Sequence, residues 1–158
     1  MRLFNRRRES PAAAGPPVDS ATFQHQTETL IPAEVRMISG CHSEQTSADV
    51  SNVNSIATLP NAAGKAGGAC TSALLEVLYA NPNLTFQTLL LKLRESLSRK
   101  GLSQIPQLTS SRPLELQETP FSLTQGTGQR RALLVGVNYR GQSGELRGCH
   151  NDVLNIKN

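Results

Sequence analysis

The stretch RALLVGVNYRGQSGELRGCHNDV, residues 131–153, decides the fold of this 158-residue chain. Ala132–Val137 is continuously apolar, which is typical of a parallel strand covered on both faces. A Gly-rich turn over 141–148 follows it, and a helical apolar stripe begins in residues 151–157. A strand, a turn and the start of a helix are therefore expected in this order. The chain stops inside this last helix, which indicates a fragment of a longer domain.

Two amphipathic helices are expected upstream of this stretch. Thr85 is placed to cap the start of the clearer one, and Gly101 is placed to end it. The other is expected over Cys70–Ala80, closed by Asn81-Pro82. The apolar residues of the clearer helix recur at helical spacing and predict one buried face; they are Phe86, Leu89, Leu90, Leu93 and Leu97.

Shorter elements and a long loop fill the rest of the chain. Val35–Ser39 is a short strand candidate that ends at Gly40, and Phe121–Leu123 is an expected edge strand. Residues 43–68 are rich in Ser, Thr, Asn, Ala and Gly. A loop of that length inside a compact domain is usually disordered or functional.

Charge and composition exclude several classes of protein. The net charge is +4, and four Arg against one Glu in residues 1–9 account for +3 of it. A nucleic-acid binder spreads its basic groups over a folded face, and this chain does not. No apolar run approaches the roughly 20 residues that span a bilayer, and the N-terminus lacks the apolar stretch of a secretory signal. We therefore expect a cytoplasmic protein with neither a nucleic-acid nor a membrane partner.

The three cysteines raise the questions of a metal site and of a nucleophilic cysteine. Their odd number and wide spacing do not suit a disulfide framework, and the pairs Cys41-His42 and Cys149-His150 lack the usual metal-ligand spacing, so no metal site is expected. The stretch from Ser39 to Ser43 looks like the surroundings of a nucleophilic Cys41. The alternative, which we favour, is that Cys41 is a small apolar residue at the end of a strand.

Several separate motifs resemble those of metacaspases, which are caspase-like cysteine endopeptidases specific for Arg or Lys. Residues 131–139 and 144–153 resemble the opening of the family's large-subunit region. Residues 37–41 and 45–49 resemble the start of its small-subunit region. That second match continues through three more segments: Gly67–Thr71, Gln104–Arg112 and Phe121–Leu123.

The order of the two regions resembles that of type III metacaspases, in which the small-subunit region comes first. The resemblance implies a caspase-like, mostly parallel sheet flanked by helices, circularly permuted and incomplete in this chain. The expected organisation has four parts: a disordered basic and Pro-rich leader (1–33), a small-subunit-like region (34–124), a flexible joint (125–130) and the start of the large-subunit-like region (131–158).

The resemblance also implies a site for the substrate. Cys149 and Asp152 match the Cys and Asp of the family's GCxND motif, which help to line the pocket for the Arg or Lys side chain of a protein substrate. Asp152 could instead simply occupy the first turn of a helix, where acids are favoured. Asp49 is a further substrate-binding candidate, with capping of its own turn as the alternative.

The catalytic machinery is expected elsewhere. The family's catalytic His and Cys motifs fall beyond Asn158, so this chain is expected to hold no catalytic residue and to be inactive alone. The resemblance implies calcium dependence of the full-length enzyme, with calcium ligands outside this chain. Two alternatives stay open: a noncatalytic caspase-like interaction module, and the junction of two tandem caspase-like domains.

Overall fold

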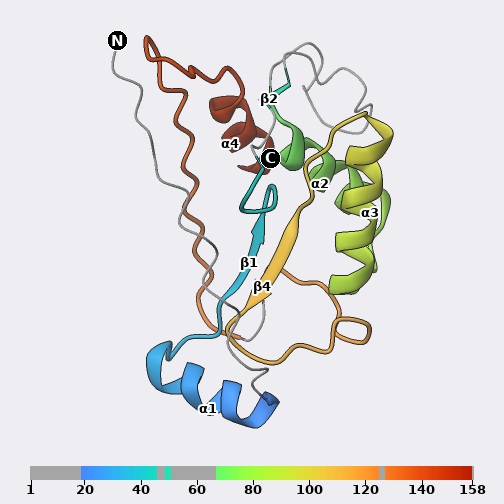
Figure 1. The fold of residues 1–158 in the computed structure, drawn as a ribbon, viewed down its shortest axis with the longest axis vertical. Helices are drawn as coiled ribbons and strands as arrows, with labels where there is room; N and C mark the ends of the chain where they lie inside the picture. Colours follow the sequence, from blue (N-terminus) through green and yellow to red (C-terminus); the bar gives the residue numbers. More distant parts are fainter. Residues whose placement is uncertain (1–18, 46–48, 51–66, 125–126, 158) are drawn as a thin grey trace.

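The computed structural model describes residues 19–45, 49–50, 67–124 and 127–157 (Figure 1). Within these ranges, no helix is long and apolar enough to cross a membrane. The elements in chain order are α1 (Ser20–Leu30), β1 (Arg36–Ser39), β2 (Asp49–Val50), β3 (Gly67–Gly68), α2 (Ala69–Ala80), α3 (Phe86–Arg99), β4 (Gln107–Ser110) and α4 (Cys149–Lys157).

Helices α2 and α3 form the core with the inner face of β1. Leu93 and Leu97 of α3 are fully buried against Ala69 and Ala73 of α2, and Ile38 of β1 packs on this cluster. The expected limits of α3 are confirmed. The Thr85 hydroxyl accepts a hydrogen bond from the amide of Thr88, and Gly101 has a φ of +72° just after the helix.

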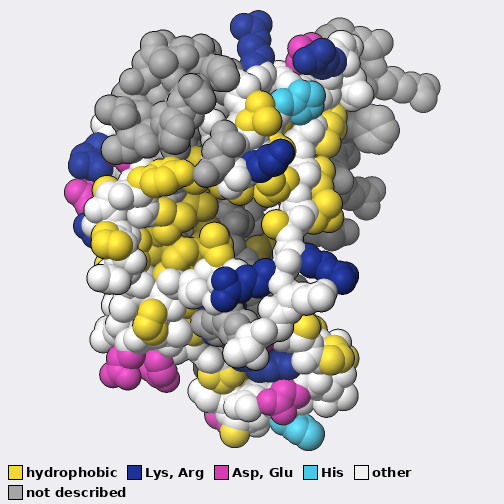
Figure 2. Space-filling view, turned by 180° about the vertical axis from the view of Figure 1, so that it is seen from behind, with side chains coloured by type: hydrophobic (Ala, Val, Ile, Leu, Met, Phe, Trp, Pro, Cys, Tyr) yellow, Lys and Arg dark blue, Asp and Glu magenta, His cyan; other side chains and the backbone are white. Residues whose placement is uncertain are grey.

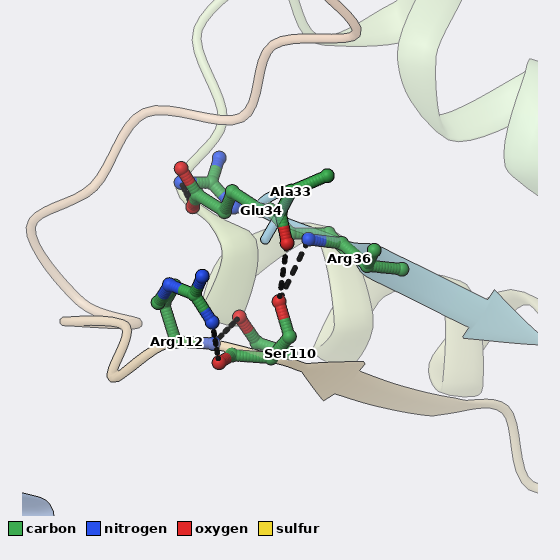
Figure 3. Close-up of polar contacts among 7 residues, drawn as sticks. Ala33, Glu34, Arg36, Ser110 and Arg112 are labelled. Atoms are coloured by element: carbon green, nitrogen blue, oxygen red, sulfur yellow. Dashed lines mark hydrogen bonds and ion pairs between the residues drawn. The ribbon is translucent and has the colours of Figure 1, made fainter. Parts of the chain in front are cut away.

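Strands β1 and β4 form an antiparallel pair, with Ile38 opposite Leu108. The sequence patterns predict β1 but miss β4, which lies in a stretch punctuated by prolines. Polar contacts close the far end of the pair (Figure 3), where the Ser111 hydroxyl accepts from the Val35 amide at 2.8 Å and donates to the Ala33 carbonyl at 3.4 Å. The same closure holds the Arg112 guanidinium, which donates to the Ser111 carbonyl at 2.9 Å.

The fold class is the expected caspase-like α/β class, although the strand pairs that the structure describes, β1–β4 and β2–β3, are both antiparallel. Residues 132–137 are extended but form no strand, because no described residue pairs with their backbone. The described residues leave much of this apolar segment bare, with Leu133 88% and Val135 74% exposed, which agrees with a sheet that is incomplete in this chain. In Figure 1 the segment runs on the β1 side of the sheet, away from β4.

Two further expectations differ from the structure. Phe121–Leu123 is not a strand; instead, the Phe121 amide donates to the Leu84 carbonyl, and Pro120 forms a single bridge with Thr85. Residues 20–30 were expected inside a disordered leader but form α1, because the Asp19 carboxylate caps the helix by accepting from the amides of residues 21 and 22. No residue of α1 is buried, so this helix depends on local hydrogen bonds. Residues 1–18 of the expected leader lie outside the described ranges, as do most of loop 43–68 and the start of the 125–130 joint.

A compact turn leads from the extended segment into α4. The Leu146 amide donates to the Asn138 carbonyl at 2.8 Å, and the Gly141 amide donates to the Glu145 carboxylate at 2.9 Å. Gly141 and Gly144 have φ values of +73° and +89°, a conformation that glycine adopts without strain. Helix α4 begins at Cys149, two residues before the expected stripe, and contacts both α2 and β3.

Candidate functional site

Asp152 lies in a pocket between α4 and the extended segment. The pocket has a volume of about 270 Å³, and the Asp152 side chain is half-buried in its wall. Cys149, the other residue predicted for the substrate pocket, lines the same cavity. The remaining lining is mostly apolar: Thr71, Leu133, Leu134, Val135, Gly136, Val137, Val153 and Ile156. The structure therefore brings the two predicted residues together beside the 133–137 segment.

The Asp152 carboxylate is held by the backbone of a distant segment. The amide of Gly68 donates to Oδ1 at 3.0 Å and to Oδ2 at 2.9 Å. Gly68 is the N-cap residue of α2, which has no side-chain cap and no acidic residue in its first turn. The carboxylate of α4 thus supplies the negative charge that the N-terminal end of a helix favours.

Close backbone approach at Gly136 brings α4 against the extended segment. A Cβ atom at this position would lie 2.5 Å from the Cys149 carbonyl oxygen and 2.9 Å from a methyl group of Val153. Only a residue without a side chain fits such a distance. Gly136 therefore sets how closely the extended segment and α4 approach one another, and with it the width of the pocket.

Asp49 lies in β2, next to the Gly68 strand. The register of the antiparallel pair β2–β3 puts Asp49 opposite Gly68 and Val50 opposite Gly67. The backbone of Asp49 is that of a short strand, and both the substrate-binding role and its alternative, capping by the side chain, stay predictions. Gly68 consequently lies between the backbone of Asp49 on one side and the carboxylate of Asp152 on the other.

The side chains of two glutamines form hydrogen bonds that hold the turn after β1, which leads toward Asp49. The Gln45 side chain donates to the Ser103 carbonyl at 2.7 Å and accepts from the Ile105 amide at 2.9 Å. The Gln104 side chain is buried and donates to the Gly40 carbonyl at 2.8 Å. The end of β1 is thereby fastened to the segment that precedes β4.

The cysteines of this region are not in disulfides. Cys41 is half-buried after β1, and its thiol donates to the Gln45 carbonyl at 3.2 Å. Burial raises the pKa of the Cys70 thiol to about 11, and the nearby Cys41 and Asp152 add to this rise. Cys70 is therefore a protonated thiol at neutral pH, unlike a nucleophilic cysteine, which needs a lowered pKa.

A larger hollow lies beside β1, and none of the predicted site residues lines it. Figure 2 shows hydrophobic side chains gathered on the face of the molecule that is seen from behind. The hollow has a volume of about 560 Å³, and the Arg36 guanidinium in its wall stands 4.8 Å from the centre of the Phe86 ring. Its other lining residues are Glu34, Ile38, Leu74, Leu108, Phe121, Ser122 and Leu123.

The described residues do not form a metal centre. No group of three or more His, Cys, Asp or Glu side chains in the described part of the chain is placed to hold an ion. The calcium dependence that the resemblance implies for the full-length enzyme stays a prediction.

Comparison with known proteins agrees with this architecture. A family model for the caspase domain matches residues 8–117, and one for the metacaspase C14 peptidase domain matches residues 130–158. The first match covers more than half of the chain, so the chain belongs to the caspase-domain peptidases of family C14. Within this family, its similarity is to metacaspases.

Three curated relatives illustrate this similarity. Metacaspase III c of Phaeodactylum tricornutum is 52% identical over 142 residues, which cover 85% of this chain and 42% of the relative. Metacaspase-3 of Trypanosoma cruzi is 49% identical over 90 residues, covering 57% of this chain and 24% of the relative. Metacaspase-1 of Pyricularia oryzae is 63% identical over 38 residues, which cover 24% of this chain and 10% of the relative. The chain thus spans less than half the length of each of these relatives.

Sequence reasoning assigned no role to two residues of the pocket region, Gly68 and Gly136. Both take part through close approach to the backbone or to a carboxylate, which leaves little trace in a single sequence. A signal existed for Gly68, because Gly67-Gly68 directly precedes a helix that has no side-chain cap. An uncapped helix start predicts that an acceptor comes from elsewhere in the chain.

Proposed function

We propose that this chain is part of a cysteine endopeptidase that cleaves peptide bonds after Arg or Lys, and that Asp152 receives the basic side chain. One observation carries the proposal: Asp152 is a half-buried carboxylate in the wall of a pocket that Cys149 also lines. Membership of the C14 peptidase family supports the reaction class.

The chemistry of the pocket suits a long basic side chain. Its walls are largely apolar and can cover the methylene stem of Arg or Lys, while a carboxylate accepts from the charged end. Charge-assisted hydrogen bonds of this kind are about twice as strong as neutral ones, so the pocket would favour a basic over a neutral side chain. Asp49, whose strand adjoins Gly68, is the second carboxylate proposed to contribute.

The catalytic cysteine and histidine are proposed to come from the part of the enzyme that this chain does not cover. The relative from Phaeodactylum tricornutum extends well beyond the 42% that the chain matches, which leaves room for them. The 158 residues alone are then inactive. Calcium dependence and a cytoplasmic location belong to the same proposal.

The test compares two matched variants of the full-length protein on fluorogenic peptides with Arg, Lys or a neutral residue before the scissile bond. Asp152→Asn should reduce kcat/KM for the Arg peptide about 10- to 150-fold, the effect of losing about 1.5–3 kcal/mol for a hydrogen bond to a charged group. The control is Asp19→Asn, because Asp19 caps α1 far along the chain and Asn caps as well as Asp.

Three results would contradict the proposal. Equal activity of Asp152→Asn and the wild type on Arg peptides would remove Asp152 from the substrate pocket. A full-length protein that cleaves no peptide would favour the noncatalytic interaction module instead. Cleavage by the 158-residue chain, lost on Cys41→Ala, would place the nucleophile inside this chain.

A further inference from the structure

We propose that the backbone amide of Gly68 is the positioning group for Asp152, and that it holds the carboxylate in the orientation in which the pocket receives a basic side chain. This inference rests on the proposed function and deepens it, because it names a residue that sets specificity without touching the substrate.

The hydrogen-bond geometry supports a role in orientation. A single N–H is shared between the two carboxylate oxygens, at 3.0 and 2.9 Å, so the amide lies between them and limits rotation of the carboxylate. A carboxylate offers about four acceptor positions, and this amide supplies one hydrogen. The Gly68 contact by itself takes up one of these positions, so it can orient Asp152 without itself excluding a guanidinium or an ammonium group.

The amide is itself held from two sides. Gly68 is the last residue of β3, which pairs with β2, and it is also the N-cap of α2. Because its N–H points at Asp152, the opposing pair Asp49–Gly68 is the kind of antiparallel pair that exchanges no backbone hydrogen bonds. Strand pairing on one side and a 12-residue helix on the other thus fix the direction of the donor.

A side chain at this position is limited by the space beside Asp152 and not by the backbone conformation. The φ and ψ of Gly68 are −67° and 133°, values that any residue adopts. A Cβ atom there, however, would lie 2.7 Å from Oδ2 of Asp152 and 3.6 Å from its Cγ. Gly68→Ala therefore displaces the carboxylate while leaving the backbone unstrained, which separates positioning from folding.

The experiment measures specificity in the full-length protein. Each variant is assayed on a peptide with Arg before the scissile bond and on the same peptide with citrulline, the neutral isostere. Gly68→Ala should lower the Arg-to-citrulline ratio of kcat/KM about tenfold, mainly through KM for the Arg peptide. The control Gly128→Ala should leave the ratio unchanged, because a Cβ there meets no atom within 4 Å.

A second variant keeps the test valid if Gly68→Ala does not fold. Asp152→Glu keeps the negative charge, but its side chain is one methylene longer. Its carboxylate therefore no longer lies where the Gly68 amide holds that of Asp152. We expect it to lose most of the Arg preference as well. An Arg preference that survives in Asp152→Glu would overturn the positioning role.

The failure of this inference differs from the failure of the proposed function. If the wild type and Asp152→Asn both lack an Arg preference, the proposed function is wrong. If Asp152→Asn loses the preference but Gly68→Ala keeps it, only the positioning role is wrong. An equal loss on the Arg and citrulline peptides in Gly68→Ala would show a merely structural role and would also overturn the inference.

Discussion

The carboxylate of Asp152 accepts a hydrogen bond from the amide of Gly68 across 84 residues of sequence, with N–O distances of 2.9 and 3.0 Å. Gly68 belongs to the part of the chain that matches the caspase-domain model, and Asp152 belongs to the part that matches the metacaspase model. Asp152 in the pocket wall is therefore held by a residue of the other part, which also contributes Thr71 to the lining.

Gly136→Ala should widen the pocket and weaken the docking of α4. The added Cβ would lie 2.5 Å from the Cys149 carbonyl oxygen, so the extended segment or the helix must move. Overpacking of this kind typically costs about 1–3 kcal/mol. The free energy of unfolding of the full-length protein measures this cost, with Gly128→Ala as the control. A Gly136→Ala protein as stable as the wild type would show that α4 does not pack on the extended segment as described.

Leu93→Ala should be strongly destabilising. Leu93 of α3 is completely buried where this helix packs against α2. Truncation of such a residue costs about 2–5 kcal/mol. Leu91 of the same helix is 55% exposed, so Leu91→Ala should change the free energy of unfolding by less than about 0.5 kcal/mol. Chemical denaturation of both variants checks the predicted face of α3, and similar losses would contradict it.

Glu76→Gln should weaken the contact between α2 and α3 and change its pH dependence. Burial alone would raise the pKa of Glu76, but the hydrogen bond and charge of Lys100, with Ser96 and Arg99, hold it below the ordinary 4.5. This stabilisation is therefore present above about pH 4.5 and is lost as the pH falls through the folded-state pKa. The pair is partly exposed, so its loss should cost only about 1 kcal/mol near pH 7.

The measurement for Glu76 is the free energy of unfolding as a function of pH. The wild type and Glu76→Gln should differ near neutrality and converge at low pH. Glu95, an exposed residue of α3, provides the control substitution Glu95→Gln. A constant difference across the whole pH range would show that Lys100 does not act on Glu76 through its charge.

The thiol of Cys70 should make the protein less stable at high pH. Burial raises its pKa from 9.0 to about 11, so the folded state retains a proton that the unfolded chain releases. The resulting stabilisation is complete below pH 9.0 and is lost as the pH rises toward 11. The gap in stability between the wild type and Cys70→Ala should therefore shrink over this range. A gap that stays constant from pH 9 to 11 would indicate a solvated thiol.

Local patterns allowed α2 and α3 to be predicted, because the start and end of each helix depend on residues that are close in sequence. Thr85 and Gly101 flank α3, and its buried stripe recurs at helical spacing. Strand β4 was missed because its partner β1 lies about 70 residues upstream, and pairing at that distance leaves no local signal. The apolarity of Ala132–Val137 reports a preference for burial, but it does not supply a neighbouring strand.

The candidate site could likewise be predicted from the sequence only in part. Cys149 and Asp152 could be proposed because a motif contains both, and they share one turn of α4. The Gly68 contact could not be proposed, since it depends on how two distant segments meet. Asp49 was expected in a loop, and its pairing opposite Gly68 likewise follows from tertiary structure.

The most direct test of the central claim measures how much the positive charge of a ligand contributes to binding at Asp152. Two peptide aldehyde inhibitors are compared on the full-length enzyme, one ending in Arg and the other in citrulline, which has the same shape without the charge. The wild type should bind the Arg inhibitor at least about tenfold more tightly, and this ratio should fall close to one in Asp152→Asn. An Arg preference of the same size in both proteins would show that the basic side chain is received elsewhere.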